Sequence, residues 1–160
     1  MQLRPVPLCI ATCVGLVINL VLSLFHVAFA RNSAFGTQQD MSVVLFAAVV
    51  FGVLGIVTDG AAGALYFWLN RRLQLTARET SFGGGAAGAL SAVASYLLSA
   101  LFAAASLVST QSQSATAAQG ALILGAALVV TLLWALIGGL AGALGSWLAR
   151  RVFIGNKAQA

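Results

Sequence analysis

The sequence contains few ionisable residues. Only 7% of its 160 residues are charged, with three acidic residues and a single histidine, whereas an average soluble domain is about 25% charged. These side chains, with two cysteines, supply neither paired carboxylates nor a Ser/His/Asp triad nor a metal-ligand cluster. No lysine followed by serine or threonine accompanies the glycines at 83–85, so a phosphate-binding loop is also missing. We therefore expect a non-enzymatic protein without a metal or a cofactor.

Hydrophobic residues make up 61% of the sequence. They form four apolar stretches, 6–30, 43–69, 82–108 and 120–148, and each is longer than the roughly 20 residues that cross a bilayer. The sequence thus predicts an all-α integral membrane protein, a bundle of four transmembrane helices in which residues 1–160 form one membrane domain. The lipid bilayer is an expected partner. Nucleic acid is not, because the net charge of +5 is not arranged as a groove-reading patch.

Most basic residues lie on one predicted side of the membrane. The N-terminus, the second loop and the C-terminus contain Arg4, Arg71, Arg72, Arg78, Arg150, Arg151 and Lys157. The first loop has Arg31 with Asp40, and the third loop has no charge. The positive-inside rule then predicts that both termini are cytoplasmic. The compactness of the chain favours the bacterial cytoplasmic membrane as its location.

One block of sequence occurs twice. Residues 60–72, GAAGALYFWLNRR, match residues 139–151, GLAGALGSWLARR, at nine of thirteen positions. This internal repeat predicts two helical hairpins, 6–72 and 82–151. A duplicated pair of helices keeps its orientation, so we expect parallel hairpins rather than inverted ones. The shared aromatic and basic residues are predicted interface anchors: Trp68, Arg71, Arg72, Trp147, Arg150 and Arg151.

Small residues recur at helical spacing in the last three apolar stretches. Because lipid gives one helix no hydrophobic drive toward another, helices in membranes associate through close packing of such residues. This glycine-zipper pattern predicts tight helix crossings. The predicted packing positions are Gly52, Gly55, Gly63, Gly84, Gly88, Gly138, Gly142 and Gly145.

The first apolar stretch has a polar face instead. Thr12, Gly15, Asn19, Ser23 and His26 share one side of the predicted helix. Amides and hydroxyls are costly to expose to hydrocarbon, so this face is expected to lie inside the bundle or against another protein.

Asp59 is the one carboxylate well inside a predicted span, and such residues are functional candidates. Counting about 1.5 Å per residue puts Asn19, Asp59 and Ser95 at similar depth, so we expect an intramembrane polar cluster. Three interpretations remain open: a proton or cation site, a docking point for a basic group of another subunit, and a protonated side chain that fixes helix packing. Asp59 aligns with Gly138, so the cluster lies where the two copies differ.

Three smaller features also leave alternatives. His26 is expected to hydrogen-bond at headgroup level; a haem or chlorophyll ligand is the alternative, although no second histidine exists as a partner. Cys9 and Cys13 lie four residues apart and are interpreted as small apolar residues. The segment around Thr76 and Glu79 is expected to be a solvated basic linker; the alternative is a short interfacial turn, because the two residues have the spacing of a capping box.

Two functions follow from these features. The leading hypothesis is an accessory or structural subunit that packs through its Gly, Ser and Ala faces against itself or a larger membrane protein complex. The alternative is a small channel or transporter that uses Asp59 as a proton or cation site. Four helices with so little polar surface hardly line a pore alone, so such a channel is expected to be oligomeric.

Overall fold

The computed structural model describes residues 4–33, 41–73, 75–108 and 117–157. Its long elements are the helices α1 (Pro5–Ser33), α2 (Met41–Asn70), α3 (Ala77–Val108) and α4 (Ala117–Lys157), and a 3-10 turn, η1 (Arg71–Leu73), follows α2. All four helices are long and apolar enough to cross a membrane. The predicted all-α bundle of four membrane-length helices is therefore confirmed. The loop segments 34–40 and 109–116 lie outside the described residues.

The helices extend beyond the apolar stretches. The largest difference is in α4, which contains 41 residues and measures about 60 Å at 1.5 Å per residue. This is about twice the thickness of the hydrocarbon core. No proline follows Trp147, and arginine is a good helix former, so the helix continues through Arg150 and Arg151. The guanidinium groups of Arg150 and Arg151 are therefore attached to the helix itself, just beyond the predicted apolar stretch that ends at residue 148.

A capping box starts α3 five residues before the predicted stretch at 82. The backbone N–H of Thr76 donates to Glu79 Oε2 at 3.1 Å, and the backbone N–H of Glu79 donates to Thr76 Oγ1 at 3.3 Å. These reciprocal bonds satisfy amide groups that have no partner within the helix. At the α3 end of this segment the structure therefore shows the capping-box turn, which was the alternative to a solvated basic linker.

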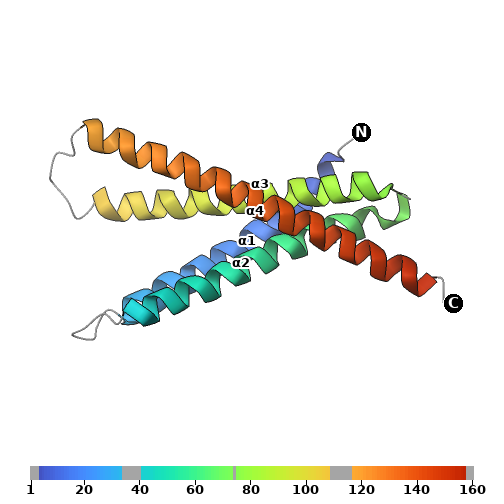
Figure 1. Cartoon of the computed structure of the whole chain (residues 1–160), viewed down its shortest axis with the longest axis horizontal. Helices are drawn as coiled ribbons and strands as arrows, with labels where there is room; N and C mark the ends of the chain where they lie inside the picture. The colour runs from blue at the N-terminus through green and yellow to red at the C-terminus, as the bar shows by residue number, and fades with distance from the viewer. Residues whose placement is uncertain (1–3, 34–40, 74, 109–116, 158–160) are drawn as a thin grey trace.

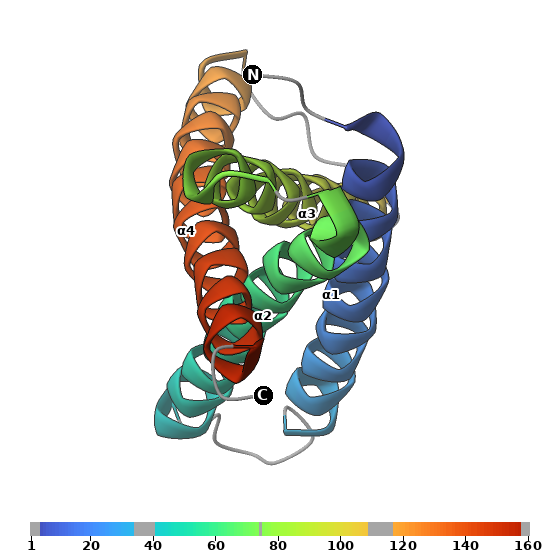
Figure 2. The same ribbon diagram turned by 90° about the vertical axis from the view of Figure 1, so that its right-hand side faces the viewer.

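The two hairpins, α1 with α2 and α3 with α4, cross one another (Figures 1 and 2). Around the bundle α1 packs on α2, α2 on α4, α4 on α3 and α3 on α1, and α2 also contacts α3. Within the described residues α1 and α4 make no packing contact. Both termini and η1 lie at one end of the molecule, and the helices come closest where the hairpins cross, near its middle (Figure 1). Toward the opposite end the hairpins separate like the arms of a fork (Figure 1).

The helices can approach closely at the crossing because the contact positions are glycines. A Cβ on Gly63 of α2 would overlap the carbonyl oxygen of Gly142 of α4, and a Cβ on Gly142 would overlap that of Gly84 of α3. Any side chain here would push the backbones apart. Gly63 and Gly142 occupy the same position in the two matching blocks of sequence.

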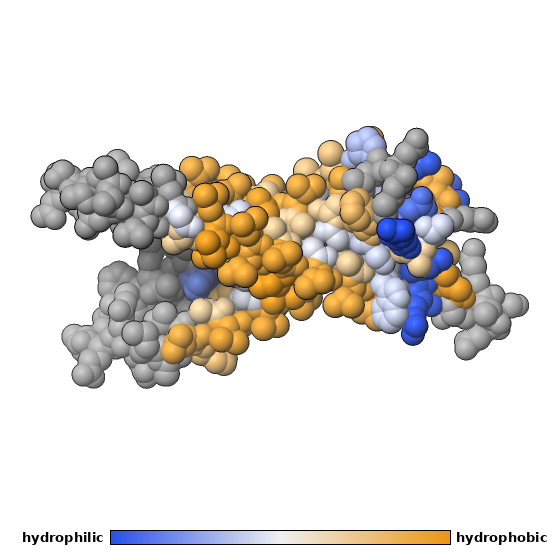
Figure 3. Space-filling model, turned by 45° about the horizontal axis from the view of Figure 1, so that its top comes forward, coloured by the Kyte–Doolittle hydropathy of each residue, from blue (hydrophilic) through white to orange (hydrophobic). Residues whose placement is uncertain are grey.

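The interior is built from small and polar side chains. Its fully buried residues include Ala11, Ala87, Ser91 and Ser146, with Tyr66 as the largest. Large apolar side chains point outward, among them Leu128 (66% exposed) and Leu140 (67%). Figure 3 shows apolar residues over the middle of the molecule and hydrophilic residues gathered at one end. This distribution suits a bundle that is solvated by lipid around its middle.

Candidate functional site

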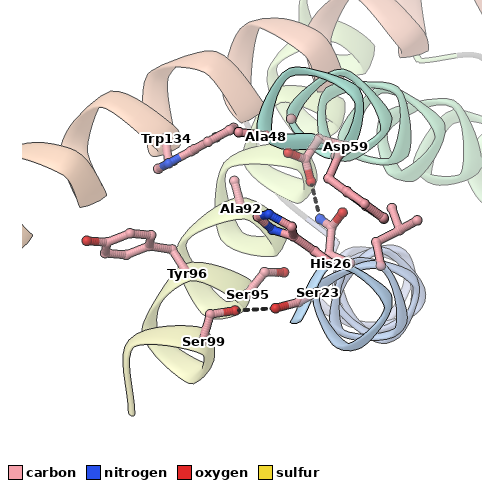
Figure 4. A pocket seen from close by; sticks show the side chains of 14 residues that line it. Ser23, His26, Ala48, Asp59, Ala92, Ser95, Tyr96, Ser99 and Trp134 are labelled. Atoms are coloured by element: carbon pink, nitrogen blue, oxygen red, sulfur yellow. Dashed lines mark hydrogen bonds between the residues drawn. The ribbon is translucent and has the colours of Figure 1, made fainter. Parts of the chain in front are cut away.

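A cavity lies in the fork between the hairpins, and we call it the vestibule. Its volume is about 450 Å³. All four helices line it (Figure 4). The lining residues are Asn19, Leu22, Ser23, His26, Ala48, Phe51, Gly52, Gly55, Asp59, Ala92, Ser95, Tyr96, Ser99 and Trp134. The vestibule thus combines one carboxyl group, one amide group, four hydroxyl groups and four aromatic rings.

Asp59 lies at the inner end of the vestibule. Asn19 Nδ2 of α1 donates to Asp59 Oδ1 of α2 at 3.0 Å and lies 3.3 Å from Ser91 Oγ of α3. The Asp59 side chain is only 2% exposed. One amide therefore connects three helices at the point where the carboxyl group is buried.

Gly138 of α4 completes the surroundings of Asp59. A Cβ on Gly138 would lie 3.1 Å from Asp59 Oδ2 and 2.6 Å from Ala92 Cβ. The absence of a side chain at this position thus leaves room for the carboxyl group. Positions 59 and 138 therefore face each other, and only position 59 carries a side chain.

Farther out, the vestibule walls carry hydroxyl and aromatic groups. The hydroxyls of Ser23 on α1 and Ser99 on α3 are 3.1 Å apart. The His26 ring stacks on Phe51 with centroids 5.0 Å apart and an interplanar angle of 19°. Tyr96 and Trp134 extend from α3 and α4 (Figure 4). Such walls can surround a hydrated cation, or an organic ammonium group against the ring faces.

The polar face of α1 is directed toward α2 and α3. Gly15 packs against Ser91 and Ala62, while Asn19, Ser23 and His26 make the contacts given above. Thr12 Oγ1 is buried and has no hydrogen-bond partner. The face that the sequence set apart therefore lies within the bundle, and its outer half lines the vestibule.

The sequence-based cluster differs from the observed one by one helical turn. Asn19 and Asp59 come together, but Ser91 is their neighbour on α3. Ser95 lines the vestibule and donates its own hydroxyl to the Ser91 carbonyl oxygen at 2.7 Å. Depth counting along straight, parallel helices does not include the crossing of the hairpins, which shifts the heights of facing residues. Phe51, Tyr96 and Trp134 were not predicted, because aromatic residues in an apolar stretch resemble lipid-facing ones.

The predicted packing glycines fall into two groups. Those toward the basic end lie at helix contacts: Gly63, Gly84, Gly88, Gly138, Gly142 and Gly145. Gly52 and Gly55 line the vestibule instead, and a Cβ on Gly52 would meet no atom within 4 Å. The glycines of the outer half of α2 therefore leave space for the cavity.

The predicted anchors form two cation–π pairs. The Arg71 guanidinium lies 4.4 Å from the Trp68 ring centroid, and that of Arg151 lies 4.2 Å from the Trp147 ring centroid. The first pair is separated by three residues because Arg71 begins the tighter 3-10 turn, whereas the second is separated by four within an α-helix. Both pairs lie at the end of the bundle remote from the vestibule.

The two cysteines form neither a disulfide nor, among the described residues, part of a metal site. Cys9 and Cys13 are free and exposed. Within the described part of the chain, no three His, Cys, Asp or Glu side chains gather as a metal site would require.

Comparison with protein-family models, with curated proteins and with solved structures finds no significant match.

Proposed function

We propose that this protein is a non-enzymatic membrane protein that binds a cation or a proton at Asp59 and passes it along the vestibule, as part of an oligomeric channel or transporter. The observation that carries the proposal is the position of the carboxyl group. A carboxyl that only fixed helix packing would have no need of a cavity, but Asp59 lies at the inner end of one that all four helices line. Intramembrane carboxylates in such positions mark ion pathways.

The arrangement of the cavity supports access from one side. On the side of the basic end, the vestibule is closed by the glycine contacts at the crossing, whereas the hairpins separate toward the other end (Figure 1). In our proposal the basic end is cytoplasmic, as the positive-inside rule requires, so the vestibule opens away from the cytoplasm. A complete pathway then needs either a second conformation or a passage between copies of the chain.

The proposal includes two parallel hairpin repeats. It is supported by the contact between Gly63 and Gly142, which are equivalent in the repeated block, and by the apposition of Asp59 and Gly138. Contacts between equivalent residues are expected close to an axis that relates the hairpins and runs along the membrane normal. The repeated residues would then form the common scaffold, and the unequal pair at 59 and 138 would form the site.

Reconstitution tests the proposed role of Asp59. We expect the wild-type protein to carry protons or monovalent cations across liposomes under an imposed gradient, and Asp59→Asn to reduce this flux to the level of empty liposomes. Asparagine keeps the shape and can still accept from Asn19, so the bundle should remain folded. The matched control is Glu79→Gln, which makes the same chemical change outside the vestibule and retains the capping box. Internal pH and cation indicators measure the flux.

The accessory-subunit function is the second candidate, and the same cavity favours it. A basic side chain from a partner helix could enter between the hairpins and pair with Asp59. In that case Asp59→Asn would leave flux unchanged and would abolish co-purification of the partner from native membranes. Unchanged flux combined with lost co-purification would therefore overturn the transport proposal. Glu79→Gln should retain the partner in either case.

A further inference from the structure

A second cavity lies at the basic end of the bundle, between α4 and the segment formed by α2 and η1. Its volume is about 240 Å³, and it shares no lining residue with the vestibule. Its polar lining consists of Asn70, Arg71 and Arg150. Phe67, Phe153 and Ile154 supply much of its apolar side. We call it the basic-end pocket.

The two arginines of this pocket carry positive charge that no described carboxylate neutralises. Asp59 is bonded to Asn19 deep in the bundle, and Glu79 is bonded to Thr76 at the start of α3. The Arg71 guanidinium is held against the Trp68 ring, an arrangement that leaves the N–H groups at its edge available to donate. Two guanidinium groups lining one small cavity are suited to a phosphate.

Asn70 adds a requirement for a hydrogen-bond donor. Its side chain is 1% exposed, and its Nδ2 donates to the Tyr66 carbonyl oxygen at 2.8 Å. Its Oδ1 is buried without a hydrogen-bond partner. Because buried acceptors in proteins are almost always paired, the pocket fits a molecule that combines a phosphate with a hydroxyl group.

The apolar side of the pocket indicates where such a molecule comes from. Phe67 and Phe153 pack edge to face with centroids 6.0 Å apart, and the exposed Ile154 continues this surface along α4. The α4 residues of the pocket lie in the last turns of the membrane-length part of α4, which ends at Ile154. A soluble phosphate would leave this surface uncovered, whereas the acyl chains of a lipid would cover it.

We propose that the basic-end pocket binds an anionic phospholipid whose headgroup carries a hydroxyl, as phosphatidylglycerol does. The phosphate lies between Arg71 and Arg150, the headgroup hydroxyl donates to Asn70 Oδ1, and the acyl chains run along Phe153 and Ile154. Arg71 and Arg150 are equivalent residues of the repeated block, so both copies contribute to one site. This site is independent of the proposed role of Asp59.

Lipid retention tests the site. The purified protein is exchanged into detergent with either phosphatidylglycerol or phosphatidylcholine, and retained lipid is counted by mass spectrometry under non-dissociating conditions. We expect one retained phosphatidylglycerol per chain, with retention about tenfold lower in Arg71→Gln/Arg150→Gln because two charge-assisted hydrogen bonds are lost. The matched control is Arg72→Gln/Arg151→Gln, which removes the same charge outside the pocket. It should stay within about twofold of the wild type, since exposed charges are screened.

Three outcomes would overturn the proposal. Equal loss of lipid in both double variants would show that retention depends on the total positive charge of this end and not on the pocket. Equal retention of phosphatidylcholine would remove the requirement for an anionic headgroup. Competition by glycerol 3-phosphate or inorganic phosphate at concentrations similar to the lipid would identify a site for a soluble anion. All variants are small changes at the end of the bundle, and their thermal unfolding in lipid-free detergent confirms that they are folded.

Discussion

Gly142→Ala is expected to destabilise the bundle by about 1–3 kcal/mol, the usual cost of overpacking a tight contact. Alanine is the better helix former, by about 1 kcal/mol in water, so propensity alone would give the opposite sign. The added methyl group, however, overlaps the Gly84 carbonyl oxygen and comes within 3.0 Å of Gly88 Cα. Neither is the flexible end of a side chain that can move aside. The helices must separate, and the contact with Gly63 is lost with them.

Gly125→Ala on the same helix is the matched control. A Cβ at Gly125 meets nothing within 4 Å, so this change should be neutral or slightly stabilising. The midpoint and slope of denaturant unfolding in mild detergent give the free energy of unfolding for both variants. Equal stability of the two variants would mean that α4 does not approach α3 as closely as described.

Gly52→Phe is expected to abolish flux without unfolding the protein. Gly52 lies seven residues before Asp59 on the same face of α2, about 10 Å farther out along the helix axis. A Cβ at Gly52 meets no atom within 4 Å, and the position lines the vestibule. The phenyl ring therefore fills the cavity rather than forcing helices apart. It blocks the approach to Asp59 while the carboxyl group and its bond to Asn19 remain unchanged.

The control for this variant is Gly125→Phe, which places the same ring on an exposed part of α4. It should retain the flux and the thermal stability of the wild type. If Gly52→Phe carried protons or cations at the wild-type rate in the same liposome assay, ions would not pass through the vestibule. The proposed pathway would then be wrong even if Asp59→Asn were inactive.

Much of the scaffold could be predicted from the sequence because the bilayer imposes strict rules. Apolar length identified four helices, and small residues at helical spacing identified the surfaces that meet at Gly63 and Gly142. The helix ends were less accurate, since hydropathy falls at Arg150 while the tendency to form helix does not. The start of α3 follows from hydrogen bonds between Thr76 and Glu79, whose spacing the sequence did reveal.

The candidate site was only partly predictable. Asn19 and Asp59 could be predicted as site residues because amides and carboxylates are costly to expose to lipid. In the structure these two side chains are hydrogen-bonded to each other. Which serine lies beside them depends on how the hairpins cross, and that angle is set by backbone contacts at glycines. The vestibule itself depends on where helices separate. No pattern within a single helix reveals that Gly52 borders space while Gly63 borders another backbone.

The proposed pathway requires that water enters the vestibule, and cysteine labelling measures this access. In a background with Cys9→Ser and Cys13→Ser, single cysteines are placed at Ser95, which lines the vestibule, or at Leu97, which is exposed on the outside of α3. A membrane-impermeant thiol reagent, which needs water to form the thiolate, is added to intact cells. We expect rapid labelling of Ser95→Cys and no labelling of Leu97→Cys. A Ser95→Cys variant as unreactive as Leu97→Cys would contradict the proposed pathway.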